Sequence, residues 1–67
     1  MLRGMKQKDL QTAEGLLEPF ADRIERSRMY ADGGRSLIVH FSDGRLRQFY
    51  SLSEVKEEVE WIIAERG

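Results

Sequence analysis

The sequence predicts an α+β domain with an N-terminal helix, a three-stranded antiparallel β-meander and a C-terminal helix, and both helices are expected to pack on one face of the sheet. Two patterns support this prediction. The apolar run Ser36–Phe41 is followed by the turn sequence Ser42–Arg45 and a second strand-like run, which is typical of a β-hairpin. Residues 51–67 then carry apolar side chains at helical spacing.

The N-terminal segment predicts a short arm followed by a helix. Residues 1–8 carry three basic side chains and no acid, so we expect a basic flexible arm there and a single domain over residues 9–67. Asp9 is a candidate helix cap. The residues expected on the buried helix face are Leu10, Ala13, Leu16 and Leu17. Pro19 should end or kink this helix, because proline has no N–H to donate.

Residues 20–30 fit two interpretations. Phe20 and Ile24 continue the helical pattern, which would give one long kinked helix. A two-stranded hairpin, however, would leave the apolar strand as an open edge, and a third strand removes that problem. We therefore favour a strand from about Ile24 to Tyr30, joined to the hairpin through Ala31–Gly34.

The hairpin prediction decides which side chains share a face. Asp43-Gly44 suits a two-residue type I′ turn, because both positions need positive φ angles. In that register the helix-covered face would carry Leu37, Val39, Phe41, Leu46 and Tyr50. The outer face would carry Ile38, His40, Arg45, Arg47 and Phe49.

The last segment predicts a helix from Leu52 to Glu65. Ser51 and Glu54 have the spacing of a capping box. The expected buried stripe is Leu52, Val55, Val59, Ile62 and Ile63. Trp61 points about 180° away from Leu52, so it should lie outside the core. Its expected neighbours on that outer face are Glu54, Glu57, Glu58, Ala64 and Glu65.

Composition excludes several classes of protein. The chain has 67 residues, a net charge of −1 and no cysteine, which excludes a disulfide framework, a cysteine-based metal site and a thiol nucleophile. The longest apolar run is Trp61–Ala64, which is too short for a membrane span. We expect a cytoplasmic protein without a cofactor.

Small size and uneven charge both favour self-association. A domain of this length buries only about 60 % of its unfolded surface, and oligomerisation is a common additional source of stability. Five glutamates against Lys56 and Arg66 give residues 51–67 a charge of −3, whereas residues 20–50 carry +2. These opposite charges could bring one copy onto another as a dimer.

The leading functional hypothesis is a non-enzymatic protein-interaction module that forms a homodimer and binds an acidic protein partner. Its expected contact residues are Trp61, Glu57 and Ala64 on the helix, with Ile38, His40, Arg45, Arg47 and Phe49 on the outer sheet face. The alternative is a small nucleic-acid-binding protein, because cations neutralise phosphates and aromatic rings stack on bases. That function would use Arg26, Arg28, Arg45, Arg47 and Phe49.

Catalysis and metal binding have little support in the sequence. His40 is the only histidine, and a catalytic set would need Ser36 or Ser42 beside it in a pocket. Neighbours on a flat strand supply neither a pocket nor an oxyanion hole. The scattered carboxylates have no metal-ligand spacing. We therefore expect no catalytic residues and no metal site.

Overall fold

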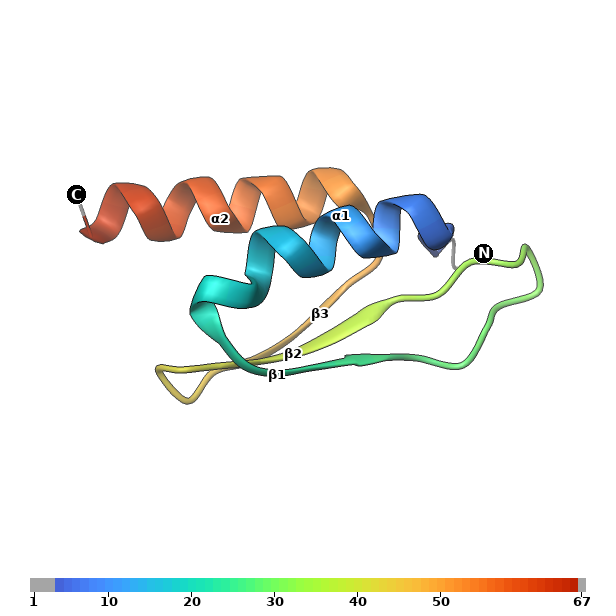
Figure 1. Cartoon of the computed structure of the whole chain (residues 1–67), viewed down its shortest axis with the longest axis horizontal. Coiled ribbons are helices and arrows are strands. Elements are labelled where there is room, and N and C mark those ends of the chain that lie inside the picture. The colour runs from blue at the N-terminus through green and yellow to red at the C-terminus, as the bar shows by residue number, and fades with distance from the viewer. Residues whose placement is uncertain (1–3, 67) are drawn as a thin grey trace.

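The computed structural model describes residues 4–66 and confirms the predicted order of elements. These elements are helix α1 (Gln7–Leu17), a 3₁₀ turn (Glu18–Phe20), strands β1 (Ala21–Arg26), β2 (Leu37–Phe41) and β3 (Leu46–Phe49), and helix α2 (Leu52–Arg66). The sheet is antiparallel in the order β1-β2-β3. Figure 1 shows α1 and α2 on the same side of the sheet, and no other described element on the opposite side.

The segment with two interpretations is a strand, but it begins earlier than expected. Pro19 lies in the 3₁₀ turn that ends α1, and β1 starts directly after that turn at Ala21. The Ser42 N–H donates to the Phe20 carbonyl at 3.0 Å, which continues the pairing of β1 with β2 at this end. At its other end β1 stops at Arg26. Residues 27–36 thus form a longer connection to β2 than the predicted four-residue turn.

The beginning of the chain packs against this connection. Met5 and Arg35 form an antiparallel bridge, with N–H···O distances of 2.7 and 2.9 Å, and Met5 is buried in the core. Helix α1 starts at Gln7 after Lys6, so Asp9 lies in the first turn and is not the cap. Residues 4–8 thus differ from the predicted arm, because the Met5 side chain is apolar and fills the core; residues 1–3 lie outside the described residues.

Two glycines allow this bridge to form. A Cβ atom at Gly4 would lie 2.3 Å from the backbone nitrogen of Arg35, and one at Gly34 would lie 2.6 Å from the backbone of Gly4. Backbone atoms cannot yield as a flexible side chain can. Both positions therefore require glycine because of close approach between the two segments.

The core lies between the helices and the inner face of the sheet. Phe49 is fully buried, and its ring packs edge to face with that of Phe41, with 6.3 Å between centroids. This geometry is favourable for aromatic pairs. The remaining buried apolar residues are Met5, Leu10, Ala13, Leu17, Leu37, Val39, Val55 and Ile62.

The hairpin differs from the prediction by one residue, and this changes the face of every side chain in β3. The Phe41 N–H donates to the Arg45 carbonyl, so the loop has three residues, 42–44. Within this loop only Gly44 has a positive φ, at 94°, as expected for a turn followed by a glycine bulge and not for type I′. A one-residue change of register moves a strand's side chains to opposite faces.

The predicted faces of β3 were therefore wrong. Phe49, Arg45 and Arg47 lie on the helix side, where Phe49 enters the core. Leu46 and Gln48 lie on the outer side, opposite His40 and Ile38 of β2. The Asp-Gly pair suits both loop lengths, and burial of the Phe49 ring favours the observed one.

Helix α2 matches its predicted bounds within one residue, but it is rotated about its axis. The Glu54 N–H donates to the Ser51 hydroxyl at 3.3 Å, as expected for a capping motif. The buried residues are Val55, Glu58 and Ile62. Ile63, predicted to be buried, is exposed, because the helix turns Glu58 towards Arg45 and Arg47.

Candidate binding site beside Trp61

A surface pocket lies where the C-terminal half of α2 meets the β2–β3 loop and the 3₁₀ turn. Trp61 lines it and remains 53 % exposed. The pocket has a volume of about 190 Å³. Its lining residues are Phe20, Phe41, Asp43, Arg45, Trp61, Ile62, Glu65 and Arg66. Three aromatic rings from three different elements thus meet at one end of the molecule.

Arg45 holds the pocket wall in place. Its guanidinium carbon lies 5.0 Å from the centre of the Phe41 ring and 5.4 Å from that of Trp61, within cation–π range of both. The Arg45 Nε donates to Asp43 Oδ2 at 2.8 Å. This hydrogen bond raises the pKa of Arg45, and the Arg45 backbone N–H lowers the pKa of Asp43. Trp61 therefore rests on a charged group fixed by the loop itself.

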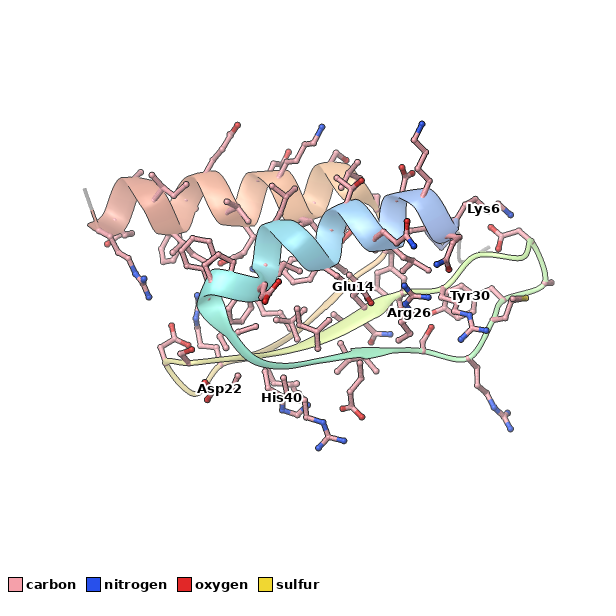
Figure 2. All side chains as sticks on the ribbon, viewed as in Figure 1. Lys6, Glu14, Asp22, Arg26, Tyr30 and His40 are labelled. Carbon is pink, nitrogen blue, oxygen red and sulfur yellow. The ribbon has the colours of Figure 1, made fainter. Side chains whose placement is uncertain are left out.

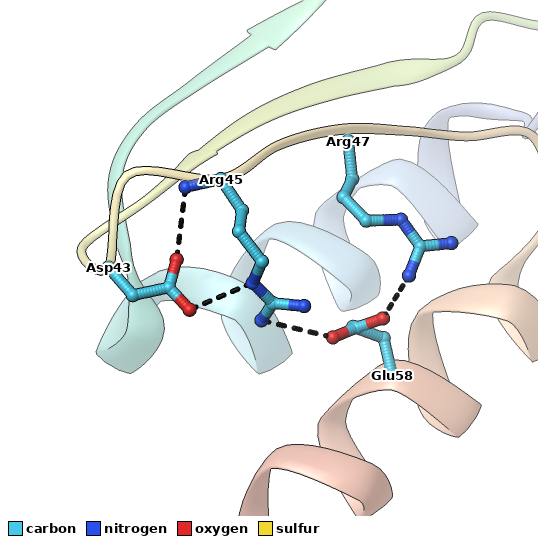
Figure 3. A network of polar contacts seen from close by, with 4 residues as sticks. All are labelled: Asp43, Arg45, Arg47 and Glu58. Carbon is cyan, nitrogen blue, oxygen red and sulfur yellow. Dashed lines mark hydrogen bonds and ion pairs between the residues drawn. The ribbon is translucent and has the colours of Figure 1, made fainter.

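Behind the pocket, Glu58 contacts two arginines, Arg47 of β3 and Arg45, which directly precedes that strand (Figure 3). The Glu58 side chain is only 7 % exposed. Its Oε1 accepts a hydrogen bond from Arg47, and its Oε2 lies 3.4 Å from the Nη2 of Arg45. Oε2 lacks a partner with hydrogen-bond geometry within residues 4–66, so Arg45 balances its charge by proximity alone. A buried carboxylate requires such compensation.

The charges that line the pocket cancel. Asp43 and Glu65 are matched in number by Arg45 and Arg66. The Arg66 guanidinium lies 5.3 Å from the centre of the Phe20 ring, within cation–π range. The pocket therefore combines aromatic walls with a neutral polar rim.

Pocket size limits the ligand. Cofactor and drug-sized sites have volumes of about 300–1,000 Å³. A pocket of about 190 Å³ is smaller, and it opens to solvent at a half-exposed tryptophan. A space of this volume can hold a group about the size of one large side chain.

The predicted contact residues do not form one surface. Glu57 and Ala64 are exposed on α2, and Ile38 and His40 lie on the outer sheet face. Arg45 and Arg47 lie instead on the helix side, where both contact Glu58.

The basic aromatic face expected for nucleic-acid binding does not form. Phe49 is fully buried, so it cannot stack on a base. Arg26 lies on the helix side, where it donates to Glu14 at 2.9 and 3.0 Å and to Gln7 (Figure 2). Arg28 is exposed in the connection that follows β1. The structure therefore places four of the predicted nucleic-acid contacts, Arg26, Arg45, Arg47 and Phe49, on the helix side of the sheet and the fifth, Arg28, in a loop.

His40 is paired with an acid and not with a serine. It projects from the side of the sheet away from the helices (Figure 2), and its Nε2 lies 3.2 Å from Glu25 Oε2. The Ser36 hydroxyl is buried and accepts hydrogen bonds from Tyr30 and Gln48. Within residues 4–66, no cluster of His, Asp or Glu side chains could hold a metal ion.

Comparison with known proteins gave no match among protein-family models, curated proteins or solved structures. Over residues 4–66, neither helix has the length and apolar character needed to cross a membrane. The function of the candidate site is therefore inferred from its geometry alone.

The sequence predicted Glu58 on the exposed face of the helix beside Trp61 and not as a member of the site, but its side chain is buried against Arg45 and Arg47. It stands among four other glutamates of residues 51–67, and nothing in its own position distinguishes it. The signal was the spacing of Glu58 from Trp61, three residues apart on one helix face, combined with the correct register of Arg45 and Arg47. This combination can be recognised only when the hairpin loop is known to have three residues, because that register places Arg45 and Arg47 on the helix side.

Proposed function

We propose that this protein is a non-enzymatic interaction module that binds a protein partner by taking one large apolar side chain into the pocket beside Trp61. The observation that carries the proposal is the half-exposed Trp61, held by Arg45 at the edge of a pocket sized for one side chain. Tryptophan and arginine are enriched among the residues that dominate binding energy at protein interfaces.

The pocket is suited to a side chain within a peptide or a folded surface. Its walls are already in place, so binding would not require Trp61 to be ordered first. The neutral rim favours a partner that presents an apolar side chain over one that depends on net charge alone. The proposal also includes self-association and a cytoplasmic setting, as expected from the size and composition of the chain.

Side-chain probes test the pocket directly. We would follow the indole N–H of Trp61 by NMR while adding N-acetyl-leucinamide, N-acetyl-phenylalaninamide or N-acetyl-aspartamide. The two apolar probes should shift the signals of Trp61, Phe20 and Phe41 in a saturable way, and the acidic probe should not.

The matched variants are Phe20→Ala, which opens the pocket but keeps Trp61, and Glu57→Gln, which changes an exposed α2 residue outside it. Phe20→Ala should weaken apolar-probe binding by about tenfold, a loss of about 1.4 kcal/mol. Glu57→Gln should leave it unchanged. Equal shifts from all three probes, or unaltered binding to Phe20→Ala, would reject the pocket as the binding site.

A further inference from the structure

The outer face of the sheet carries an ordered arrangement of side chains that the pocket does not use. Both helices lie on the other side, and no helix of the described residues covers this face (Figure 1). The pairing register places its side chains in two rows that cross the strands. One row is Arg23, His40 and Leu46, and the other is Glu25, Ile38 and Gln48.

These rows have opposite charge at the β1 edge. Arg23 Nη2 lies 3.0 Å from Glu25 Oε1 within one chain, and both side chains remain well exposed, at 67 % and 41 %. Such an exposed pair contributes little to stability alone. At the β3 edge, Leu46 is 62 % exposed. The face therefore presents exposed charged groups and exposed apolar area.

We propose that a second copy of this chain stacks on the outer face through a two-fold axis that crosses the strands at the level of Val39. This axis keeps each strand over its own counterpart but reverses its direction, so each row lies over the opposite row of the partner. Arg23 then faces the partner's Glu25, and Leu46 covers the partner's Gln48. Stacked sheets are separated by about 10 Å, a distance that long side chains from both faces fill.

A two-fold axis could also run between the two stacked sheets parallel to β2, but that arrangement is less favourable. It would place each row over the same row of the partner. His40 would face its own counterpart, and Arg23 would face the partner's Leu46 with no acid opposite it. Charge complementarity therefore selects the axis that crosses the strands.

This inference rests on the self-association included in the proposed function, but it does not use the pocket. Trp61 lies on α2, on the other side of the sheet. Loss of pocket binding and loss of the dimer can thus be observed separately.

Charge reversal and charge exchange test the arrangement by sedimentation equilibrium. The wild type should be a dimer at micromolar concentration. Glu25→Arg and Arg23→Glu should each weaken it by at least about tenfold, because like charges then face each other across the axis. The double variant R23E/E25R should recover dimerisation to within about threefold of wild type, because each exchanged charge again meets its opposite.

Controls separate this interface from the helix surface. Glu57→Arg makes the same charge change on exposed α2 and should leave the dimer intact. Circular dichroism should show unchanged folding for every variant, since all substituted side chains are exposed at the surface. A monomeric wild type, failure of the double variant to recover, or dissociation caused by Glu57→Arg or Trp61→Ala would overturn the inference.

Discussion

At both edges of the sheet, arginine side chains form ion pairs with a glutamate of the neighbouring helix, but the two glutamates are buried to different degrees. At the β1 edge, Arg26 reaches up to Glu14 of α1 and makes two hydrogen bonds to its carboxylate. At the β3 edge, Arg45 and Arg47 both reach Glu58 of α2. The Glu14 side chain is 31 % exposed, whereas that of Glu58 is 7 % exposed.

The comparison shows how one arrangement can serve two purposes. Charged side chains that point inwards from an edge strand discourage another strand from pairing there, and both edges have them. Water still reaches the Arg26–Glu14 pair, so its removal should cost little. The Glu58 carboxylate is buried away from water, so its charge must be compensated by Arg45 and Arg47. At the β3 edge the ion pairs are therefore part of the packed interior.

The largest effect is expected from removing Glu58. Glu58→Ala should lower the free energy of unfolding by about 2 kcal/mol, less than for a fully buried pair because both arginines keep contact with water. Urea denaturation followed by circular dichroism measures this change. Glu57→Ala, one residue away and exposed, is the control. Equal effects of the two substitutions would show that Glu58 has no special role.

The β1 edge should respond more weakly. Glu14→Ala removes the only acid within reach of Arg26 among the described ion pairs, but water can replace it, so the loss should be less than half of that for Glu58→Ala. Raising the salt concentration to 1 M should reduce the Glu14 effect more than the Glu58 effect, because exposed pairs are screened more strongly. The opposite order of salt sensitivity would contradict the comparison.

The smallest effect concerns the loop that supports the β3 edge. The pKa of Asp43 is lowered by hydrogen bonds from the backbone and side chain of Arg45. A carboxyl group with a lowered folded-state pKa stabilises the fold above its unfolded pKa of about 4, and this contribution is lost as the pH falls below that value. Asp43→Asn should therefore be less stable than wild type at pH 7.

The difference between Asp43→Asn and wild type should shrink as the pH falls from 5 to 2, as measured by urea denaturation at each pH. The Asp22→Asn variant, which changes an acid on the exposed side of β1, is the matched control. A pH-independent difference for Asp43→Asn would indicate that its carboxylate charge has no part in the effect.

The sequence predicted the architecture because its strongest local patterns agree with the tertiary structure. The hydrophobic spacing of Leu10, Ala13 and Leu17 indicated the buried face of α1, and the alternation of Leu37, Val39 and Phe41 indicated that of β2. Pro19 correctly marked the end of α1. In each of these cases, burial of apolar area and local propensity favour the same structure.

The candidate site was harder to predict because it depends on register. Arg45, Arg47 and Phe49 alternate with Leu46 and Gln48, and both sets contain residues that could face the core. Sequence spacing alone cannot distinguish a two-residue loop from a three-residue loop at Asp43-Gly44. The choice follows from tertiary contacts, namely the Phe41–Phe49 pair and the carboxylate of Glu58, which come from separate elements.

The contact between Gly4 and Gly34 links two parts of the molecule mechanically. Gly34 follows the tip of the 27–36 connection, and Gly4 precedes the core residue Met5. Because the two backbones touch, the tip cannot shift towards the start of α1 without pushing Met5 out of its place. A movement of this tip would therefore displace Met5 and disturb the packing of the core.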